Sequence, residues 1–169
     1  MSSENKFKMP NSLNEHWMPF TSNRDFKEKP RLIIEAKGCY LKNHEGKTQI
    51  DASSGLFCNP LGHGRQEIID AITNQLKTVD YCQPFQQGFG GSFELASKIA
   101  KHTPGDLNKM FFTICGSTAV ETAIKIAVAY HRAKGDAQRF RFVGRERGYH
   151  GMNIGCVSVG GMVNNVKTF

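Results

Sequence analysis

An apolar run that stops at a glycine and opens directly into a helical pattern is the feature that most limits how this chain folds. The run covers residues 110–115, Gly116 ends it, and Ser117 and Thr118 follow before helical periodicity begins. Such a pattern predicts a buried strand, a turn of small residues and then a helix that starts at residue 119.

A turn of this kind is suited to an anion. The first N–H groups of a helix have no intrahelical partner, and the helix dipole places partial positive charge at the same end. Gly116 has no Cβ, so an anion can approach the backbone closely, and the hydroxyls of Ser117 and Thr118 add donors. The sequence therefore predicts a phosphate site at residues 116–118.

Two patterns divide the chain. Residues 31–50 alternate between apolar and polar positions around a turn at 44–46, which predicts a small antiparallel sheet, and a loop rich in Gly, Ser, Asn and Pro follows at 52–64. The later expected elements are helices at 66–79, 93–101 and 119–133 and strands at 110–115 and 139–144. Their alternation predicts a parallel α/β sheet.

Local signals also predict where helices begin and end. Ser92 is expected to cap the helix at 93–101, and Thr118 with Glu121 matches a capping box, in which each side chain satisfies a free N–H group. Gly135 is expected to end the helix at 119–133.

The predicted domains follow from these two patterns. Residues 1–60 are expected to form an N-terminal arm with the small antiparallel sheet, and residues 61–169 the beginning of a large α/β domain. A parallel sheet needs cover on both faces, and only two of its strands are recognisable, so the chain is expected to be truncated within this domain. The polar residues 1–14 lack the apolar core of a signal peptide and are expected to be mobile.

Composition excludes several classes of protein. The net charge is +7, but most basic residues alternate with acidic ones, and the basic excess at 139–147 lacks a nucleic-acid motif. That excess is left as surface charge or part of a subunit contact. The five cysteines and six histidines show no metal-ligand spacing, and no apolar stretch is long enough for a membrane span. We expect a cytoplasmic protein without a metal, disulfide, nucleic-acid or membrane partner.

Ten segments spread along nearly the whole chain match one protein family. They are residues 16–21, 50–58, 62–64, 80–86, 93–96, 111–117, 122–127, 130–133, 144–151 and 159–162. In these segments the chain resembles the class III pyridoxal-phosphate-dependent aminotransferases, most closely the β-alanine (ω-amino acid)–pyruvate transaminases. The resemblance implies the α/β fold type I of such transferases. It assigns to this chain the N-terminal segment and the first part of the large parallel-sheet domain.

The same resemblance implies that pyridoxal 5′-phosphate is the cofactor. It assigns Gly116, Ser117 and Thr118 to the cofactor phosphate, Tyr149 to the face of the pyridine ring, and His150 to the same loop. Aromatic stacking of this kind contributes about 0.5–1.5 kcal/mol beyond area burial. From the residues alone, Tyr149 is better explained as an aromatic that packs in a surface loop.

The resemblance also places three aromatic residues around the substrate. Phe20, Phe57 and Phe85 are expected to line its pocket, partly across a dimer interface, although each is a core residue by composition alone. The chain departs from the family at Thr118, where an acid is usual, at Phe57, where Trp is common, and at Cys115, which replaces a more polar residue. Because of these departures, the resemblance does not determine the geometry of the phosphate turn or the width of the substrate pocket.

The family's chemistry requires a Schiff-base lysine and an aspartate that keeps the pyridine nitrogen protonated. By resemblance both lie beyond residue 169, so the chain is expected to hold no catalytic residue and to be inactive alone. The complete protein is expected to move an amino group from an ω-amino acid such as β-alanine to pyruvate. Its expected partners are a small amine donor and a keto-acid acceptor, and its expected assembly is a homodimer or a tetramer of dimers.

Two interpretations of the short chain remain open. In the first, it is part of a longer aminotransferase, which acts on β-alanine or, as a rival within the family, on taurine or a diamine. In the second, it is a non-catalytic fragment or remnant that binds a phosphate ligand or a partner subunit. The sequence does not decide between a natural truncation and a partial record.

Overall fold

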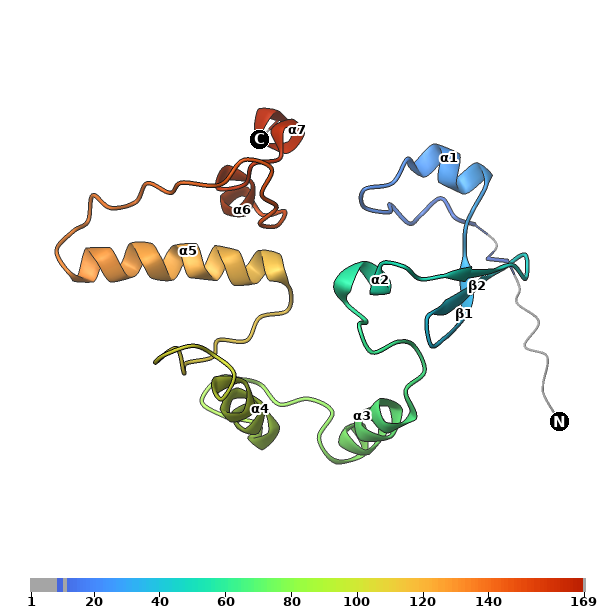
Figure 1. Cartoon of the computed structure of the whole chain (residues 1–169), viewed down its shortest axis with the longest axis horizontal. Helices are drawn as coiled ribbons and strands as arrows, with labels where there is room; N and C mark the ends of the chain where they lie inside the picture. The colour runs from blue at the N-terminus through green and yellow to red at the C-terminus, as the bar shows by residue number, and fades with distance from the viewer. Residues whose placement is uncertain (1–8, 11, 169) are drawn as a thin grey trace. The chain divides into compact units, whose positions relative to one another are not determined.

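The computed structural model of the chain describes residues 9, 10 and 12–168 (Figure 1). The chain forms two compact units, of which the first ends at Gln83 and the second begins at Pro84, and each is described by itself. The domain division between residues 60 and 61 stays a prediction. Residues 1–8 and 11, which make up most of the expected N-terminal arm, lie outside the described residues.

The first unit is built on a three-stranded antiparallel sheet. Its strands are β1 (Ile33–Lys37), β2 (Tyr40–Asn43) and β3 (Thr48–Ile50), in the order β1-β2-β3. Gly38 and Gly46 occupy the two hairpin turns with φ of 56° and 83°, a backbone region that suits glycine. The predicted antiparallel sheet with a turn at 44–46 is confirmed.

A short helix, α1 (Asn23–Glu28), precedes the sheet and buries Phe26. The Arg31 guanidinium carbon lies 5.6 Å from the centre of the Phe26 ring, a cation–π contact. Before the helix, the Asn23 side chain pairs with the backbone of Met18 in both directions, each bond 2.9 Å long. These bonds close the turn that contains Phe20, whose φ is 48°.

Between the sheet and the next helix lies α2 (Ser54–Phe57), a single turn of left-handed helix. Its four residues have φ of 51°, 59°, 58° and 67°, and only Gly55 is a glycine. A left-handed conformation costs roughly 1–2 kcal/mol at each other residue because Cβ crowds the following carbonyl oxygen. The sequence predicted a loop here and gave no sign of this turn.

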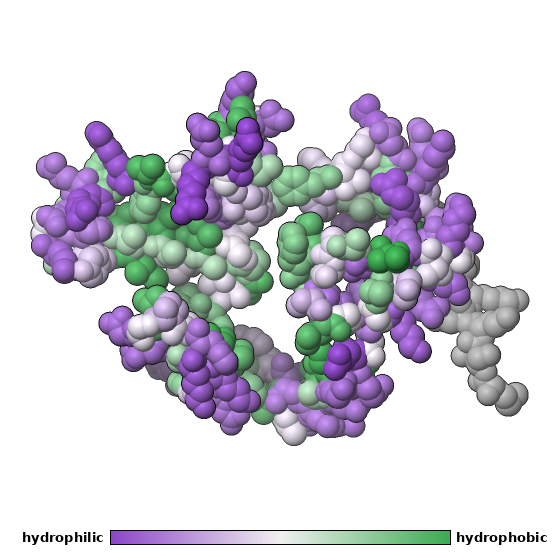
Figure 2. Space-filling model, viewed as in Figure 1, coloured by the Kyte–Doolittle hydropathy of each residue, from purple (hydrophilic) through white to green (hydrophobic). Residues whose placement is uncertain are grey.

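The last helix of the first unit is α3 (Gln66–Thr78), which confirms the helix predicted at 66–79. Its apolar face, however, stays exposed to solvent, with Ile72 and Leu76 more than half exposed. Figure 2 shows apolar residues, in green, at the surface of both units. None of the described helices is long and apolar enough to cross a membrane.

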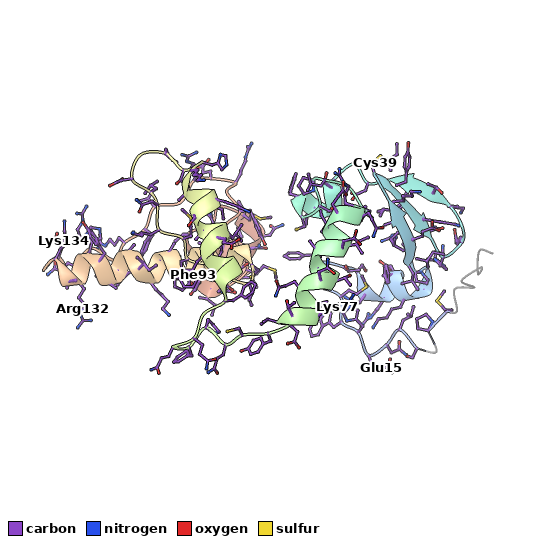
Figure 3. All side chains as sticks on the ribbon, turned by 90° about the horizontal axis from the view of Figure 1, so that it is seen from below. Glu15, Cys39, Lys77, Phe93, Arg132 and Lys134 are labelled. Carbon is purple, nitrogen blue, oxygen red and sulfur yellow. The ribbon has the colours of Figure 1, made fainter. Side chains whose placement is uncertain are left out.

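The second unit contains four helices in its described part, α4 (Gly90–Ala100), α5 (Gly116–Ala133), α6 (Ile154–Ser158) and α7 (Val163–Thr168). The prediction that Ser92 caps α4 is wrong, because the helix begins two residues earlier and the Ser92 hydroxyl donates to the Phe89 carbonyl oxygen instead. Gly135, with φ of 88°, follows the end of α5 as predicted. Arg132 and Lys134 project from that end (Figure 3), where cations favour the helix dipole.

The parallel strands predicted at 110–115 and 139–144 are not formed within the described residues. There, strand pairing is confined to the antiparallel sheet and one bridge between Gly38 and His63. Both segments carry almost fully exposed side chains, Ile114 at 95% and Val143 at 99%. A strand needs a partner for its backbone groups, and the pairing found among the described residues does not include either of these segments.

Candidate functional site

The first turn of α5 presents backbone donors that have no partner within the helix. Cys115 precedes the helix in extended backbone, and the first intrahelical bond runs from the Ala119 N–H to the Cys115 carbonyl oxygen over 3.0 Å. The helix therefore offers no carbonyl partner to the amides of Gly116, Ser117 and Thr118. Because these residues carry no acidic side chain, the positive end of the helix dipole is not neutralised from within the turn.

The predicted capping box is wrong. The helix begins at Gly116, three residues before the predicted start, so Thr118 lies inside the first turn and not at its cap. The Thr118 hydroxyl lies 3.4 Å from the Cys115 sulfur, and the Glu121 carboxylate faces the Cys156 thiol. Cys115 occupies the capping position in place of a residue with a side-chain oxygen.

The turn already favours negative charge on the group nearest to it. The hydroxyl and then the backbone amide of Thr118 donate to the Cys115 sulfur and hold the pKa of its thiol below the ordinary value, with a smaller contribution from Ser117. Desolvation raises the pKa of the Cys115 thiol, but the hydrogen bonds lower it by more. A thiolate at a helix N-terminus is stabilised by the same donors that bind a phosphate.

This turn lines a cleft of about 390 Å³ in the second unit. The lining residues are Cys115, Gly116, Ser117, Val120, Tyr149, His150 and Gly151. Small-molecule sites typically have volumes of roughly 300–1,000 Å³. The space beside the Gly116 Cα is open. A Cβ built on this residue would have no atom within 4 Å apart from those of its chain neighbours and of the helix backbone.

Three contacts hold the loop of Tyr149 and His150 against the turn. The Met152 N–H donates to the Ser117 Oγ over 3.0 Å, which leaves the hydroxyl hydrogen of Ser117 available as a donor. The Cys156 thiol donates to the Ser117 carbonyl oxygen over 3.1 Å. At Gly151 a Cβ would lie 2.8 Å from the Ser117 Cα, so only glycine allows this approach.

A second set of contacts fixes α6 on α5. Cys156 is fully buried, and its sulfur lies 3.6 Å from the Glu121 Oε2. Burial raises the pKa of the Cys156 thiol, and the neighbouring Glu121 carboxylate raises it further. This cysteine stays protonated and acts as a donor, in contrast to Cys115. Gly155 contributes by leaving room for the Glu121 carboxylate, which lies 2.7 Å from the position of a Cβ.

The predicted site residues are distributed over both units. Gly116, Ser117, Tyr149 and His150 line the one cleft, and Thr118 lies in the same turn without lining it. Of the predicted substrate residues, Phe20 and Phe57 belong to the first unit and Phe85 to the second. All three are more than 70% exposed, so they are not core residues of the described structure. Their roles stay predictions.

Sequence reasoning did not assign to four residues the roles that they have in shaping the cleft. Gly151 and Cys156 hold the turn through Ser117, Glu121 fastens Cys156, and Cys115 both lines the cleft and lies under the helix dipole. Gly151 stood inside a segment that carried the resemblance, and the glycine itself was the signal. Cys156 and Glu121 interact over 35 residues of sequence, and no local pattern marks such a pair.

A family model described as Aminotransferase class-III matches residues 21–169 of the sequence. The chain belongs to the class III aminotransferases. Members of this family depend on pyridoxal 5′-phosphate. The family resemblance seen in the ten sequence segments is thereby confirmed.

Individual relatives of this class III aminotransferase chain agree with the family model. The β-alanine–pyruvate aminotransferase of Pseudomonas aeruginosa is 47% identical over 158 residues, which cover 94% of this chain and 35% of that enzyme. The ω-amino acid–pyruvate aminotransferase of Pseudomonas putida is 48% identical over 157 residues, with 93% and 35% covered. The chain thus spans 35% of the length of these two relatives.

A solved structure supports the fold. The ω-transaminase of Pseudomonas jessenii, crystallised with PMP, matches with a TM-score of 0.88 at 32% identity over 94% of this chain and 36% of that one. The expected fold type I class is confirmed by this likeness, although the parallel sheet is not formed among the described residues.

Proposed function

We propose that this class III aminotransferase chain holds the cofactor phosphate and one face of the pyridine ring in an enzyme that moves an amino group from an ω-amino acid to pyruvate. The observation that carries the proposal is the cleft lined both by the open first turn of α5 and by Tyr149. β-Alanine is the favoured donor and pyruvate the acceptor, because the two Pseudomonas relatives are named for such substrates.

The phosphate is held by the first turn of α5. The amides of Gly116, Ser117 and Thr118 and the hydroxyl of Ser117 would donate to the oxygens of a bound phosphate. The fit is supported by the open space at Gly116 and by donors that already lower the pKa of the Cys115 thiol. A bound phosphate would compete with the Cys115 sulfur for the donors of Thr118 and Ser117.

The ring is held by the loop that carries Tyr149. This side chain is 58% exposed and lines the cleft, so its face is available for stacking on the pyridine ring. His150 lines the same cleft and is partly buried, so it would help to hold the loop that carries Tyr149. When bound, pyridoxal phosphate supplies the electron sink for bond breaking at the substrate carbon.

Each of Phe20, Phe57 and Phe85 is proposed to offer an apolar surface to the carbon chain of the donor amine in the complete enzyme. Their exposure supports this role, because an exposed large aromatic side chain is available to a ligand. Phe57, in place of the Trp common in the family, widens the pocket and removes an indole N–H donor.

The lysine that binds the cofactor covalently and the aspartate at the pyridine nitrogen come from outside these 169 residues. In support, none of the described residues that line the cleft is a lysine. The chain alone then binds cofactor without catalysing transfer. The whole protein assembles as a homodimer or as a tetramer of dimers in the cytoplasm.

Binding is tested with pyridoxamine 5′-phosphate, which needs no lysine, and with pyridoxamine, which lacks the phosphate. Calorimetry on the 169-residue chain is expected to give a Kd at least about tenfold lower for the phosphorylated ligand, as charge-assisted hydrogen bonds predict. Ser117→Ala is expected to remove most of this preference, and Ser97→Ala, on the exposed surface of α4, to leave it unchanged. Equal affinity for both ligands would contradict the phosphate site.

Catalysis is tested by joining the chain to the remaining C-terminal part of the Pseudomonas aeruginosa relative. The chimera is expected to convert pyruvate to alanine with β-alanine as donor. If the chain binds pyridoxamine 5′-phosphate but the soluble chimera shows no pyruvate-dependent turnover, the non-catalytic alternative of a phosphate-binding fragment takes the place of the enzyme.

A further inference from the structure

The left-handed turn α2 is not held by the packing of its own side chains. Three of its four residues, Ser54, Leu56 and Phe57, have Cβ atoms that disfavour a positive φ. Leu56 and Phe57 are 74% and 85% exposed, so burial contributes little to offset this cost. Inside the turn, the Phe57 N–H donates to the Ser53 carbonyl oxygen over 2.9 Å. Another group must therefore stabilise the turn.

The Asp51 carboxylate is that group. Its Oδ2 accepts from the Gly55 N–H over 2.8 Å, and its Oδ1 accepts from the N–H and the hydroxyl of Ser53 over 3.3 and 3.1 Å. On its other side the His63 Nε2 lies 3.2 Å from Oδ2. The Asp51 side chain is only 6% exposed, so these four donors replace nearly all of its water.

Asp51 and His63 are both fastened to the hairpin turn between β1 and β2. The Asp51 N–H donates to the carbonyl oxygen of Cys39, which is labelled in Figure 3, over 2.8 Å. His63 exchanges two backbone bonds with Gly38, of 2.9 and 2.8 Å. The absence of a Cβ at Gly62 allows residues 62 and 38 to approach closely, because a Cβ there would lie 3.1 Å from the Gly38 carbonyl oxygen. The hairpin turn, which lies outside α2, therefore holds Asp51 and His63 in place.

We propose that Asp51 and His63 are positioning residues that hold α2 in its left-handed conformation and thereby fix the place of Phe57. Resting on the proposed function, this makes them specificity-determining residues for the donor amine, because they set where an aromatic wall of its pocket stands. His63 acts through Asp51, since its ring donates to the same oxygen that receives the Gly55 amide. Neither residue needs to touch the substrate.

The clamp is tested on the 169-residue chain by hydrogen exchange of the amides of Gly55, Phe57 and Asn59. Asp51→Asn and His63→Ala are expected to lower the protection of these amides about tenfold, which corresponds to the loss of one charge-assisted hydrogen bond. His63→Gln, which keeps a side-chain donor, is expected to restore part of it. Asp106→Asn removes an equal charge from the other unit and serves as the matched control.

Two outcomes of this exchange experiment overturn the clamp. One is unchanged protection at Gly55, Phe57 and Asn59 in both Asp51→Asn and His63→Ala. The other is an equal loss of protection across β1 and β2, which would make the pair a general stabiliser of the unit. If His63→Ala fails to fold, His63→Gln takes its place. Protection that is retained in part at the α2 amides shows that a side-chain donor is needed at this position.

The link to specificity is tested in the chimera with the Pseudomonas aeruginosa relative. His63→Ala is expected to raise the KM for the donor amine several-fold while kcat changes little, because cofactor binding lies elsewhere. A fall in kcat with an unchanged KM would overturn the specificity role. If the unsubstituted chimera itself has no turnover, the proposed function has failed, and the exchange result still decides the clamp.

Discussion

The buried thiol of Cys156 donates to the backbone carbonyl oxygen of Ser117, and this one bond joins α6 to the first turn of α5. The carbonyl belongs to the residue whose amide and hydroxyl face the cleft. The orientation of the first turn of α5 is therefore set by a segment almost forty residues later in the chain. A change that moves α6 is expected to alter the turn before it alters the rest of α5.

Gly151→Ala tests the close approach of the two segments. Gly151 has φ of 119°, which an L side chain rarely adopts, and its new Cβ would lie 2.8 Å from the Ser117 Cα. We expect a loss of about 1–3 kcal/mol in the free energy of unfolding and a matching loss of pyridoxamine 5′-phosphate affinity. Gly90→Ala, where a Cβ meets open space, is the control in urea unfolding and is expected to be neutral or slightly stabilising.

Alkylation with iodoacetamide, followed residue by residue by mass spectrometry, tests the field at the start of α5. The lowered pKa of Cys115 and its exposure predict fast modification near neutral pH, whereas burial and a raised pKa predict slow modification of Cys156. Thr118→Val removes the largest cause of the shift and is expected to move the Cys115 rate profile to higher pH. Pyridoxamine 5′-phosphate is expected to protect Cys115, and an unprotected Cys115 with ligand bound would place the phosphate elsewhere.

Unfolding as a function of pH tests the charge of Asp51. Desolvation raises the pKa of Asp51, but hydrogen bonds from His63, Ser53 and Gly55 outweigh it and hold this pKa below the ordinary value. A carboxyl whose pKa falls on folding stabilises the native state at neutral pH, and this contribution is lost as the pH falls through the folded-state pKa. Asp51→Asn is therefore expected to be less stable than wild type at pH 7, with the difference closing in acid. A difference independent of pH would mean that charge is not involved.

Paired glycine substitutions test the strain in α2. Leu56→Gly removes a Cβ from a residue at φ of 58° whose side chain is largely exposed, and is expected to raise the free energy of unfolding by up to about 1 kcal/mol. Leu95→Gly, in the regular helix α4, is expected to lower it by about 1 kcal/mol. Effects of the same sign in both variants, measured by urea unfolding, would show that α2 is unstrained.

Local sequence patterns predicted the parts of the fold that depend on neighbours along the chain. The alternation at 31–50 and the periodicity at 66–79 were sufficient because β1 to β3 are joined by short turns and α3 satisfies its own backbone. The strands at 110–115 and 139–144 failed because pairing depends on distant segments that periodicity does not reveal. The start of α5 was misplaced by three residues because Thr118 and Glu121 imitate a capping box, while their side chains bind Cys115 and Cys156.

The candidate site was predictable to the same extent. The turn at residues 116–118 followed from an apolar run, a glycine and a helix, all contiguous in sequence, and its role as an anion site stays a prediction. Tyr149 was singled out only by family resemblance. α2 was beyond local reasoning, because Leu56 and Phe57 contradict the preference for glycine at positive φ. Only the meeting of Asp51 with His63, twelve positions apart, explains their conformation.

In α2, the residues that fix the backbone are different from the residue whose side chain is presented to solvent. Backbone placement depends on Asp51, His63 and the hairpin, while the outward-facing Phe57 contributes almost no packing of its own. Phe57 can therefore be replaced by another residue without changes to the residues that hold the α2 backbone. Under the proposed function, natural variation or laboratory evolution at this one position is expected to change amine preference at little risk to folding.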